Sequence, residues 1–194
     1  MEKSLIHYSS FINCVSILTS KQVYFGNVFY SNDRFEKSNV SDVMDDGYFV
    51  FCTTTRDFDA LMWLAYAKSE YGSAIKFIFK KGADFNDLFK SKDYKIESFE
   101  VNYTKDYYVE IGDDLDLLGK KKDIRFQGES EYRFLIHLSN NDEKKYNRNI
   151  PIDFNFDCLS KIELIINPKL KTIADFVVEK IKNLLPVQIN FVME

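Results

Sequence analysis

The chain has 194 residues, a formal net charge of −4, and 45% hydrophobic against 29% charged residues. This composition excludes a disordered polymer and a membrane-embedded protein, and the length predicts a single domain, residues 1–194, with a true hydrophobic core. The acidic balance argues against a nucleic acid partner, because such proteins neutralise many phosphates with basic side chains.

The three cysteines, Cys14, Cys52 and Cys158, are far apart in the chain and form no C-x-x-C pair. This spacing predicts reduced thiols and no metal site. The N-terminal residues lack the apolar core of a signal peptide, and no apolar run is long enough to span a bilayer. We therefore expect a cytoplasmic protein that binds neither a metal nor a membrane.

Taken in chain order, the hydrophobic pattern alternates between the periods of strands and helices. It predicts helices at 11–19, 60–71, 84–89 and 173–185. It predicts strands at 5–8, 21–29, 48–52, 73–80, 99–103, 129–138, 162–166 and 187–192. Several strands follow one another without a helix between them. This order favours an α+β fold with a mixed, mainly antiparallel sheet and helices packed against it.

The same pattern makes finer predictions for two helices. Helix 60–71 should place Leu61, Leu64 and Ala65 on one stripe and end at Gly72, with Met62, Tyr66 and Ser69 on the adjacent stripe. Helix 173–185 should bury the apolar residues that share one face, which are Ile173, Phe176, Val177, Ile181, Leu184 and Leu185.

Two basic features have ordinary structural interpretations. Lys120, Lys121 and Lys122 follow an acidic stretch, which is typical of a solvated loop. His137 lies in an apolar strand and is expected to be packed there.

Polar groups interrupt the apolar pattern at four places. These are His7 with Tyr8, the turn Asn32-Asp33-x-x-Glu36, the helical aromatics Trp63 and Tyr66, and Glu129-x-Glu131-x-Arg133. Local hydrogen bonding, turn formation, core packing or a row of surface ion pairs would explain them, and so would a ligand cleft.

The last of these patterns is the most informative. Glu129, Glu131 and Arg133 alternate with period two, so all three should project from one face of a strand. Two carboxylates on one face repel each other unless a cation or a ligand hydroxyl lies between them, and Arg133 is the candidate cation.

The four patterns together resemble, in order, an uncharacterised bacterial family catalogued as domain of unknown function 2971. More distantly, the layout resembles ADP-ribosyltransferases of the His-Tyr-Glu kind, which include phage-defence and toxin proteins. The resemblance implies an ADP-ribosyltransferase-like split sheet, NAD as the substrate, and transferase or NAD glycohydrolase activity.

The resemblance also implies roles for individual residues. His7 would bind the adenine-ribose hydroxyls, and Glu131 the 2′-hydroxyl of the nicotinamide ribose. Glu129 would orient the acceptor, and Tyr66 or Trp63 would stack on nicotinamide. Tyr8 and Arg133 complete the NAD-binding set.

Four further residues, Asn32, Asp33, Glu36 and Thr53, are cleft candidates without an assigned role. Thr53-Thr54-Thr55 stands where the enzymes carry a Ser-containing segment, and Tyr8-Ser9-Ser10 follows a histidine that they follow with Gly or Thr.

Two alternatives remain open. The same fold could be a non-catalytic module for a nucleotide-like ligand or a protein partner. Alternatively, Asp33, Glu36, Glu129 and Glu131 could hold Mg²⁺ in a nuclease, although the acidic balance disfavours nucleic acid binding.

Overall fold

The structure is a computed structural model that describes residues 2–30, 47–57, 59–67, 71–105, 120–138, 142–183, 185 and 188–193. The chain divides into two compact units. Unit 1 comprises 1–23, 53–90 and 153–194, and unit 2 comprises 24–52 and 91–152. Compactness does not say whether either unit folds alone, so the single domain stays a prediction.

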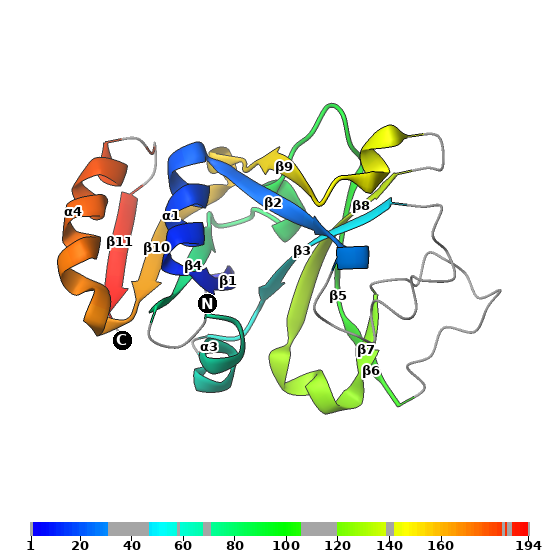
Figure 1. Cartoon of the computed structure of the whole chain (residues 1–194), viewed down its shortest axis with the longest axis horizontal. Helices are drawn as coiled ribbons and strands as arrows, with labels where there is room; N and C mark the ends of the chain where they lie inside the picture. The colour runs from blue at the N-terminus through cyan, green and yellow to red at the C-terminus, as the bar shows by residue number, and fades with distance from the viewer. Residues whose placement is uncertain are drawn as a thin grey trace. The chain divides into compact units, whose positions relative to one another are not determined.

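The described residues form both predicted kinds of element (Figure 1). The strands are β1 (Ser4–Ser10), β2 (Gln22–Asn27), β3 (Gly47–Thr54), β4 (Gly72–Phe79), β5 (Ile96–Glu100), β6 (Asn102–Thr104), β7 (Lys121–Asp123), β8 (Glu131–Leu138), β9 (Asn149–Asp153), β10 (Leu159–Ile166) and β11 (Gln188–Met193). The α-helices are α1 (Phe11–Ser20), α3 (Ala60–Tyr66) and α4 (Lys171–Lys182). The 3₁₀ turns are η1 (Val28–Tyr30), η3 (Phe85–Leu88), η5 (Ile124–Glu129), η6 (Glu143–Tyr146), η7 (Phe156–Cys158) and η8 (Pro168–Leu170).

The sheet of unit 1 has the strand order β11-β10-β4-β1, and Thr54 at the end of β3 pairs with Ile6 of β1. Strand β4 is antiparallel to both β1 and β10, whereas β11 runs parallel to β10. Helices α1 and α3 contact strands of this sheet, and α4 contacts β11 (Figure 1). The predicted α+β class, with a mixed and mainly antiparallel sheet, is confirmed.

Helix α1 forms where the sequence predicts it. The side chain of Ser10 caps it by accepting a hydrogen bond of 3.3 Å from the backbone N–H of Asn13. Its buried face carries Phe11, Cys14, Ile17 and Leu18. All three cysteines are free thiols, and Cys14 and Cys158 are buried in unit 1.

Helix α3 is shorter than predicted. It ends at Tyr66, and Leu64 and Ala65 lie exposed, while Trp63 and Ala67 are buried. Gly72 does not cap the helix but begins β4, opposite Ser10. A Cβ atom at Gly72 would lie 2.3 Å from the carbonyl oxygen of Ala67, so the close approach of these two segments requires glycine.

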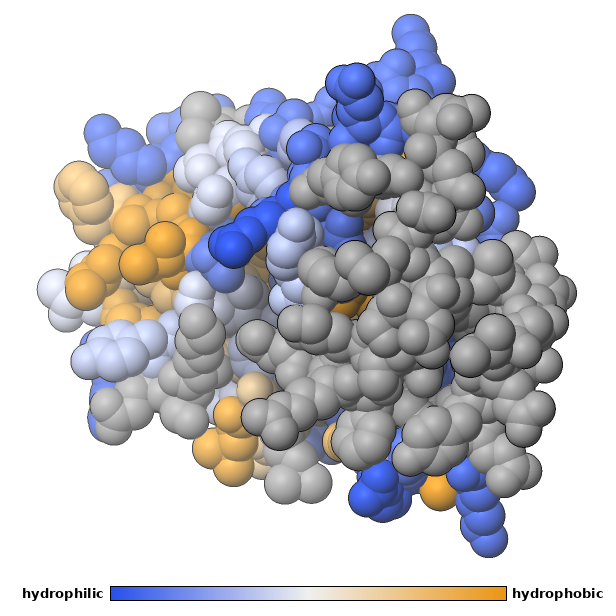
Figure 2. Space-filling view, turned by 45° about the vertical axis from the view of Figure 1, so that its right-hand side comes forward, coloured by the Kyte–Doolittle hydropathy of each residue, from blue (hydrophilic) through white to orange (hydrophobic). Residues whose placement is uncertain are grey.

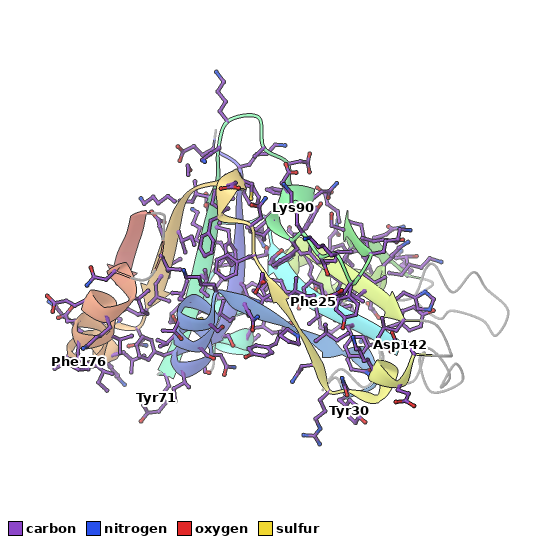
Figure 3. All side chains as sticks on the ribbon, turned by 90° about the horizontal axis from the view of Figure 1, so that it is seen from above. Phe25, Tyr30, Tyr71, Lys90, Asp142 and Phe176 are labelled. Carbon is purple, nitrogen blue, oxygen red and sulfur yellow. The ribbon has the colours of Figure 1, made fainter. Side chains whose placement is uncertain are left out.

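Helix α4 and the residues after it bury part of the predicted face, since Ile181 and Leu185 are buried. Ala174 and Ile181 are buried, whereas Ile173 and Phe176 are exposed. The predicted stripe is therefore wrong at these two positions, and Leu184 lies outside the described residues. Phe176 points away from the ribbon (Figure 3), and hydrophobic surface shows at the left of the space-filling view (Figure 2).

The sheet of unit 2 has the strand order β9-β2-β3-β8-β5, and β6 and β7 form a separate parallel pair. Strand β5 is antiparallel to β8. The core of this unit includes Val28, Tyr48 and Leu135, with Phe99 packed against them. His137 is not packed in the core as predicted; it is exposed, and its ring stacks on Tyr48 with centroids 4.5 Å apart.

No helix among the described residues is both long enough and apolar enough to cross a membrane.

We predict that Gly72→Ala destabilises the protein by about 1–3 kcal/mol or more, because the new methyl group would overlap backbone atoms of Ala67. Urea denaturation measures this free energy of unfolding. Gly26→Ala is the matched control, since its nearest neighbour, the Oδ1 atom of Asn149, would lie 3.9 Å away. Equal stability of the two variants would contradict the prediction.

Candidate active site

Four charged side chains of unit 2 form one ion-pair network, in which Lys122, Glu131 and Arg133 are buried and Glu129 is partly exposed. Arg133 donates to both carboxylate oxygens of Glu131, from Nε to Oε1 at 2.8 Å and from Nη2 to Oε2 at 3.0 Å. Lys122 donates from Nζ to Oε2 of Glu129 at 2.5 Å and to Oε2 of Glu131 at 3.3 Å. Two cations therefore balance two anions in a place with little access to water.

The burial of this network is unusual for charged groups. The side chain of Arg133 is 2% exposed, and those of Lys122 and Glu131 are each 7% exposed. Transfer of such groups out of water costs several kcal/mol per ion unless each is paired and hydrogen-bonded. The pairing of every member explains how the fold tolerates them.

One strand pairing and one turn bring these side chains together. Strands β6 and β7 pair in parallel, with Tyr103 opposite Lys122. Ser130 adopts the left-handed conformation (φ 45°) between η5 and β8. This turn places Glu129 at the end of η5 and Glu131 at the start of β8. Both carboxylates therefore accept hydrogen bonds from the ammonium group of Lys122.

The structure corrects the period-two interpretation in part. Glu129 lies outside the strand, in η5, so only Glu131 and Arg133 share a strand face. The cation between the two carboxylates is Lys122, which the sequence pattern had assigned to a solvated loop. Lys122 is buried because β7 pairs with β6 and turns this one side chain inward.

The network controls the ionisation of Glu131. Burial raises the pKa of its carboxyl group, but the charges and hydrogen bonds of Arg133 and Lys122 outweigh burial and lower the pKa to about 2. The thiol of Cys52 adds a hydrogen bond that acts in the same direction. Glu131 is therefore a carboxylate at any physiological pH.

Tyr103 is a further member that the sequence did not single out. Its hydroxyl oxygen accepts a hydrogen bond of 2.9 Å from the backbone N–H of Glu131. Burial raises the pKa of Tyr103, and the nearby carboxylates of Glu131 and Glu129 also disfavour its ionised form. Tyr103 thus remains a neutral phenol that fixes the start of β8.

The candidate site residues of unit 1 differ in how far they are buried. Tyr8 and Trp63 are buried in one hydrophobic cluster, with their rings edge to face and centroids 6.4 Å apart. Tyr66 is exposed at the end of α3. His7 lies half-buried in β1, and Thr53 is buried near the end of β3. Of the two stacking candidates, Tyr66 has the accessible ring.

Tyr8 also has a positioning role within unit 1. Its hydroxyl oxygen accepts a hydrogen bond of 3.1 Å from the backbone N–H of Asp59. The side chain of Asp59 in turn accepts from the backbone N–H of Met62, near the start of α3. The His7-Tyr8 and Trp63-Tyr66 patterns are therefore linked through one helix start.

Asn32, Asp33 and Glu36 lie outside the described residues. Within the part of the chain that the structure describes, no group of three or more His, Cys, Asp or Glu side chains could hold a metal ion. Two members of the predicted Mg²⁺ set, Asp33 and Glu36, are among the undescribed residues, so the nuclease alternative stays a prediction.

No family model matches the chain, and no curated protein matches it. Among solved structures, it is similar to DarT from Thermus sp. 2.9 in complex with NAD+. The identity is 7%, the match covers 97% of this chain and 94% of that chain, and the TM-score is 0.44. A likeness of this size identifies neither a ligand nor an activity.

We predict that Glu131 makes the protein lose stability in acid between about pH 4.5 and pH 2. The folded pKa of about 2 is below the ordinary value of 4.5, so the contribution is complete above 4.5 and is lost as the pH falls through the folded value. The difference corresponds to about 3 kcal/mol. Urea denaturation at several pH values measures it.

Glu131→Gln should flatten this part of the stability curve, because the variant has no carboxyl group to protonate. Glu97→Gln is the matched control in the same unit. The pKa of Glu97 is also lowered, chiefly by its hydrogen bond with Lys95, but its side chain is 42% exposed and solvent screens the pair. Identical pH slopes for the wild type and Glu131→Gln would rule the prediction out.

Proposed function

We propose that the protein binds NAD+ and breaks the bond between nicotinamide and its ribose, as an ADP-ribosyltransferase or NAD glycohydrolase. The observation that carries the proposal is the carboxyl group of Glu131, held at the start of β8 by hydrogen bonds from Arg133 and Lys122. The sequence resemblance supplies the substrate class, and the network supplies a group suited to its chemistry.

The reaction places specific demands on that group. As the bond breaks, nicotinamide leaves with the electron pair, and positive charge develops on the ribose ring. A fixed carboxylate with little water around it stabilises this charge more than water does. The acceptor, water or a macromolecular nucleophile, then bonds to the ribose carbon and releases its proton to solvent. Glu129 orients this acceptor.

Glu131 is already hydrogen-bonded, which bears on how it would reach a substrate. Two of its bonds are replaceable: the Lys122 contact of 3.3 Å is longer than an ordinary hydrogen bond, and a thiol such as Cys52 is a weak donor. A ribose hydroxyl can take the place of either donor while Arg133 keeps both of its bonds to the carboxylate.

We predict that Glu131→Gln lowers the rate of nicotinamide release from NAD+ by about 10²–10³-fold, the loss typical of removing one electrostatic stabiliser of a transition state. Chromatographic measurement of nicotinamide over time gives the rate. Glu97→Gln, in the same unit but on an exposed strand edge, should keep the wild-type rate.

Folding must be checked beside the rate, because Gln at position 131 leaves Arg133 and Lys122 short of one partner charge. A native circular dichroism spectrum of Glu131→Gln at the assay temperature meets this need. Wild-type activity in the folded variant would remove Glu131 from the reaction, and no release by the wild type, with no ADP-ribose transfer in a lysate, would remove the reaction itself.

One observation favours a second candidate, a non-catalytic NAD+-binding module. Arg133, Lys122 and Cys52 together donate to all of the roughly four acceptor positions of the Glu131 carboxylate. In such a module the network would only stabilise unit 2. NAD+ at 100 times its dissociation constant would then add about 2.7 kcal/mol of stability without any nicotinamide release.

The roles of His7, Tyr8, Trp63 and Tyr66 in binding NAD+ stay predictions, as do a protein partner and a setting in phage defence or a toxin system. Of the two candidates for stacking, the ring of Tyr66 is exposed and that of Trp63 is buried. Membership of the family catalogued as domain of unknown function 2971 also stays a prediction.

A further inference from the structure

Lys122 has no role of its own in the bond-breaking and transfer steps of the proposed reaction. It comes from β7, whereas Glu131 and Arg133 come from β8 and Glu129 from η5. Its ammonium group lies 2.5 Å from Glu129 and 3.3 Å from Glu131. Lys122 is therefore the group through which the two carboxylates are connected.

The two contacts of the Lys122 ammonium group differ in strength. The contact with Glu129 is short and charge-assisted, and such bonds are roughly twice as strong as neutral ones. The contact with Glu131 lies beyond the usual range for a nitrogen-to-oxygen hydrogen bond. An ammonium group anchored on Glu129 can thus release Oε2 of Glu131 without becoming unpaired.

The ring of Phe126 also holds Lys122, because the ammonium nitrogen lies 5.1 Å from its centroid. A cation over an aromatic face is attracted by the ring, and the attraction increases where water is excluded. With Glu129 and Phe126 both on η5, this turn fixes the position of the ammonium group independently of Glu131.

We propose that Lys122 is a positioning residue, which keeps the carboxylate of Glu131 ionised and yields Oε2 to a ligand hydroxyl while staying bound to Glu129. This inference rests on the proposed function. Its electrostatic part concerns Glu131 alone and can be measured without turnover.

Three other groups among the described residues bond to Glu131. Arg133 on the same strand makes two hydrogen bonds, Cys52 on β3 donates one, and Tyr103 on β6 accepts from its backbone. Each of these remains in a Lys122→Met variant, so the change in ionisation isolates the ammonium group.

The experiment compares Lys122→Met with Lys120→Met in the full chain. Lys120 is two residues away and pairs with Glu97 at 3.4 Å, so it offers the same substitution at a lysine–glutamate pair outside the network. Carbon-13 NMR of the side-chain carboxyl of Glu131 follows its protonation, and nicotinamide release is measured as a function of pH.

An opposite charge at this distance shifts a pKa by about 1–3 units. We expect Lys122→Met to raise the pKa of Glu131 by about that amount, so that protonation becomes visible above about pH 3, and to raise the acidic limb of the kcat/KM profile equally. Lys120→Met should leave both unchanged.

An unshifted carboxyl pKa in Lys122→Met overturns the inference, and so does a rate that falls equally at every pH, which marks a merely structural lysine. Failure of the proposed function is different: no variant, nor the wild type, releases nicotinamide. In that case the NMR titration still decides whether Lys122 sets the ionisation of Glu131.

A second variant guards against misfolding. Lys122→Met with Glu129→Gln removes one charge of each sign, so no unpaired ion stays behind in the network. In this double variant the pKa of Glu131 should lie between those of the wild type and Lys122→Met. Loss of the Lys122 charge raises this pKa, and loss of the Glu129 charge lowers it by part of that amount. A value at or below that of the wild type contradicts the inference.

Discussion

The arrangement of unit 2 depends on pairing three buried charged groups, Lys122, Glu131 and Arg133, with each other and with the partly exposed Glu129. Arg133 alone would be an uncompensated buried cation, and Glu131 alone an uncompensated buried anion. Their mutual hydrogen bonds, with Lys122 joining Glu129 to the pair, make the network neutral. Removal of one member of a buried pair typically costs about 3–5 kcal/mol, so the network fixes the elements that carry it.

That constraint has a chemical consequence. A carboxylate with a pKa of about 2 is not available as a proton donor, but it is well suited to stabilise positive charge. Arg133 donates hydrogen bonds to both oxygens of Glu131 and so fixes the orientation of the carboxylate. In the proposed reaction, Lys122 and Cys52 make the bonds that a ligand hydroxyl would replace. The network thus combines a fixed orientation with replaceable contacts.

Unit 1 depends on apolar packing rather than on buried ion pairs. Its unusual residues are mostly apolar or aromatic, and packing rather than charge decides where they lie. Tyr8 and Trp63 meet edge to face in a core cluster, and Gly72 lies so close to Ala67 that no larger side chain fits there. Close packing of this kind leaves Tyr66 as the aromatic of α3 with an accessible ring.

The sequence by itself determined the fold class and most element positions, because period and end signals such as the Ser10 cap are local. It also marked Glu131 and Arg133 as a pair on one strand face. Only the tertiary structure decided that Lys122 lies between the carboxylates. Strand β7 pairs with β6, which is distant in sequence, and Ser130 adopts a left-handed backbone conformation that a non-glycine residue rarely takes. Burial of charge depends on such contacts, and no local pattern encodes them.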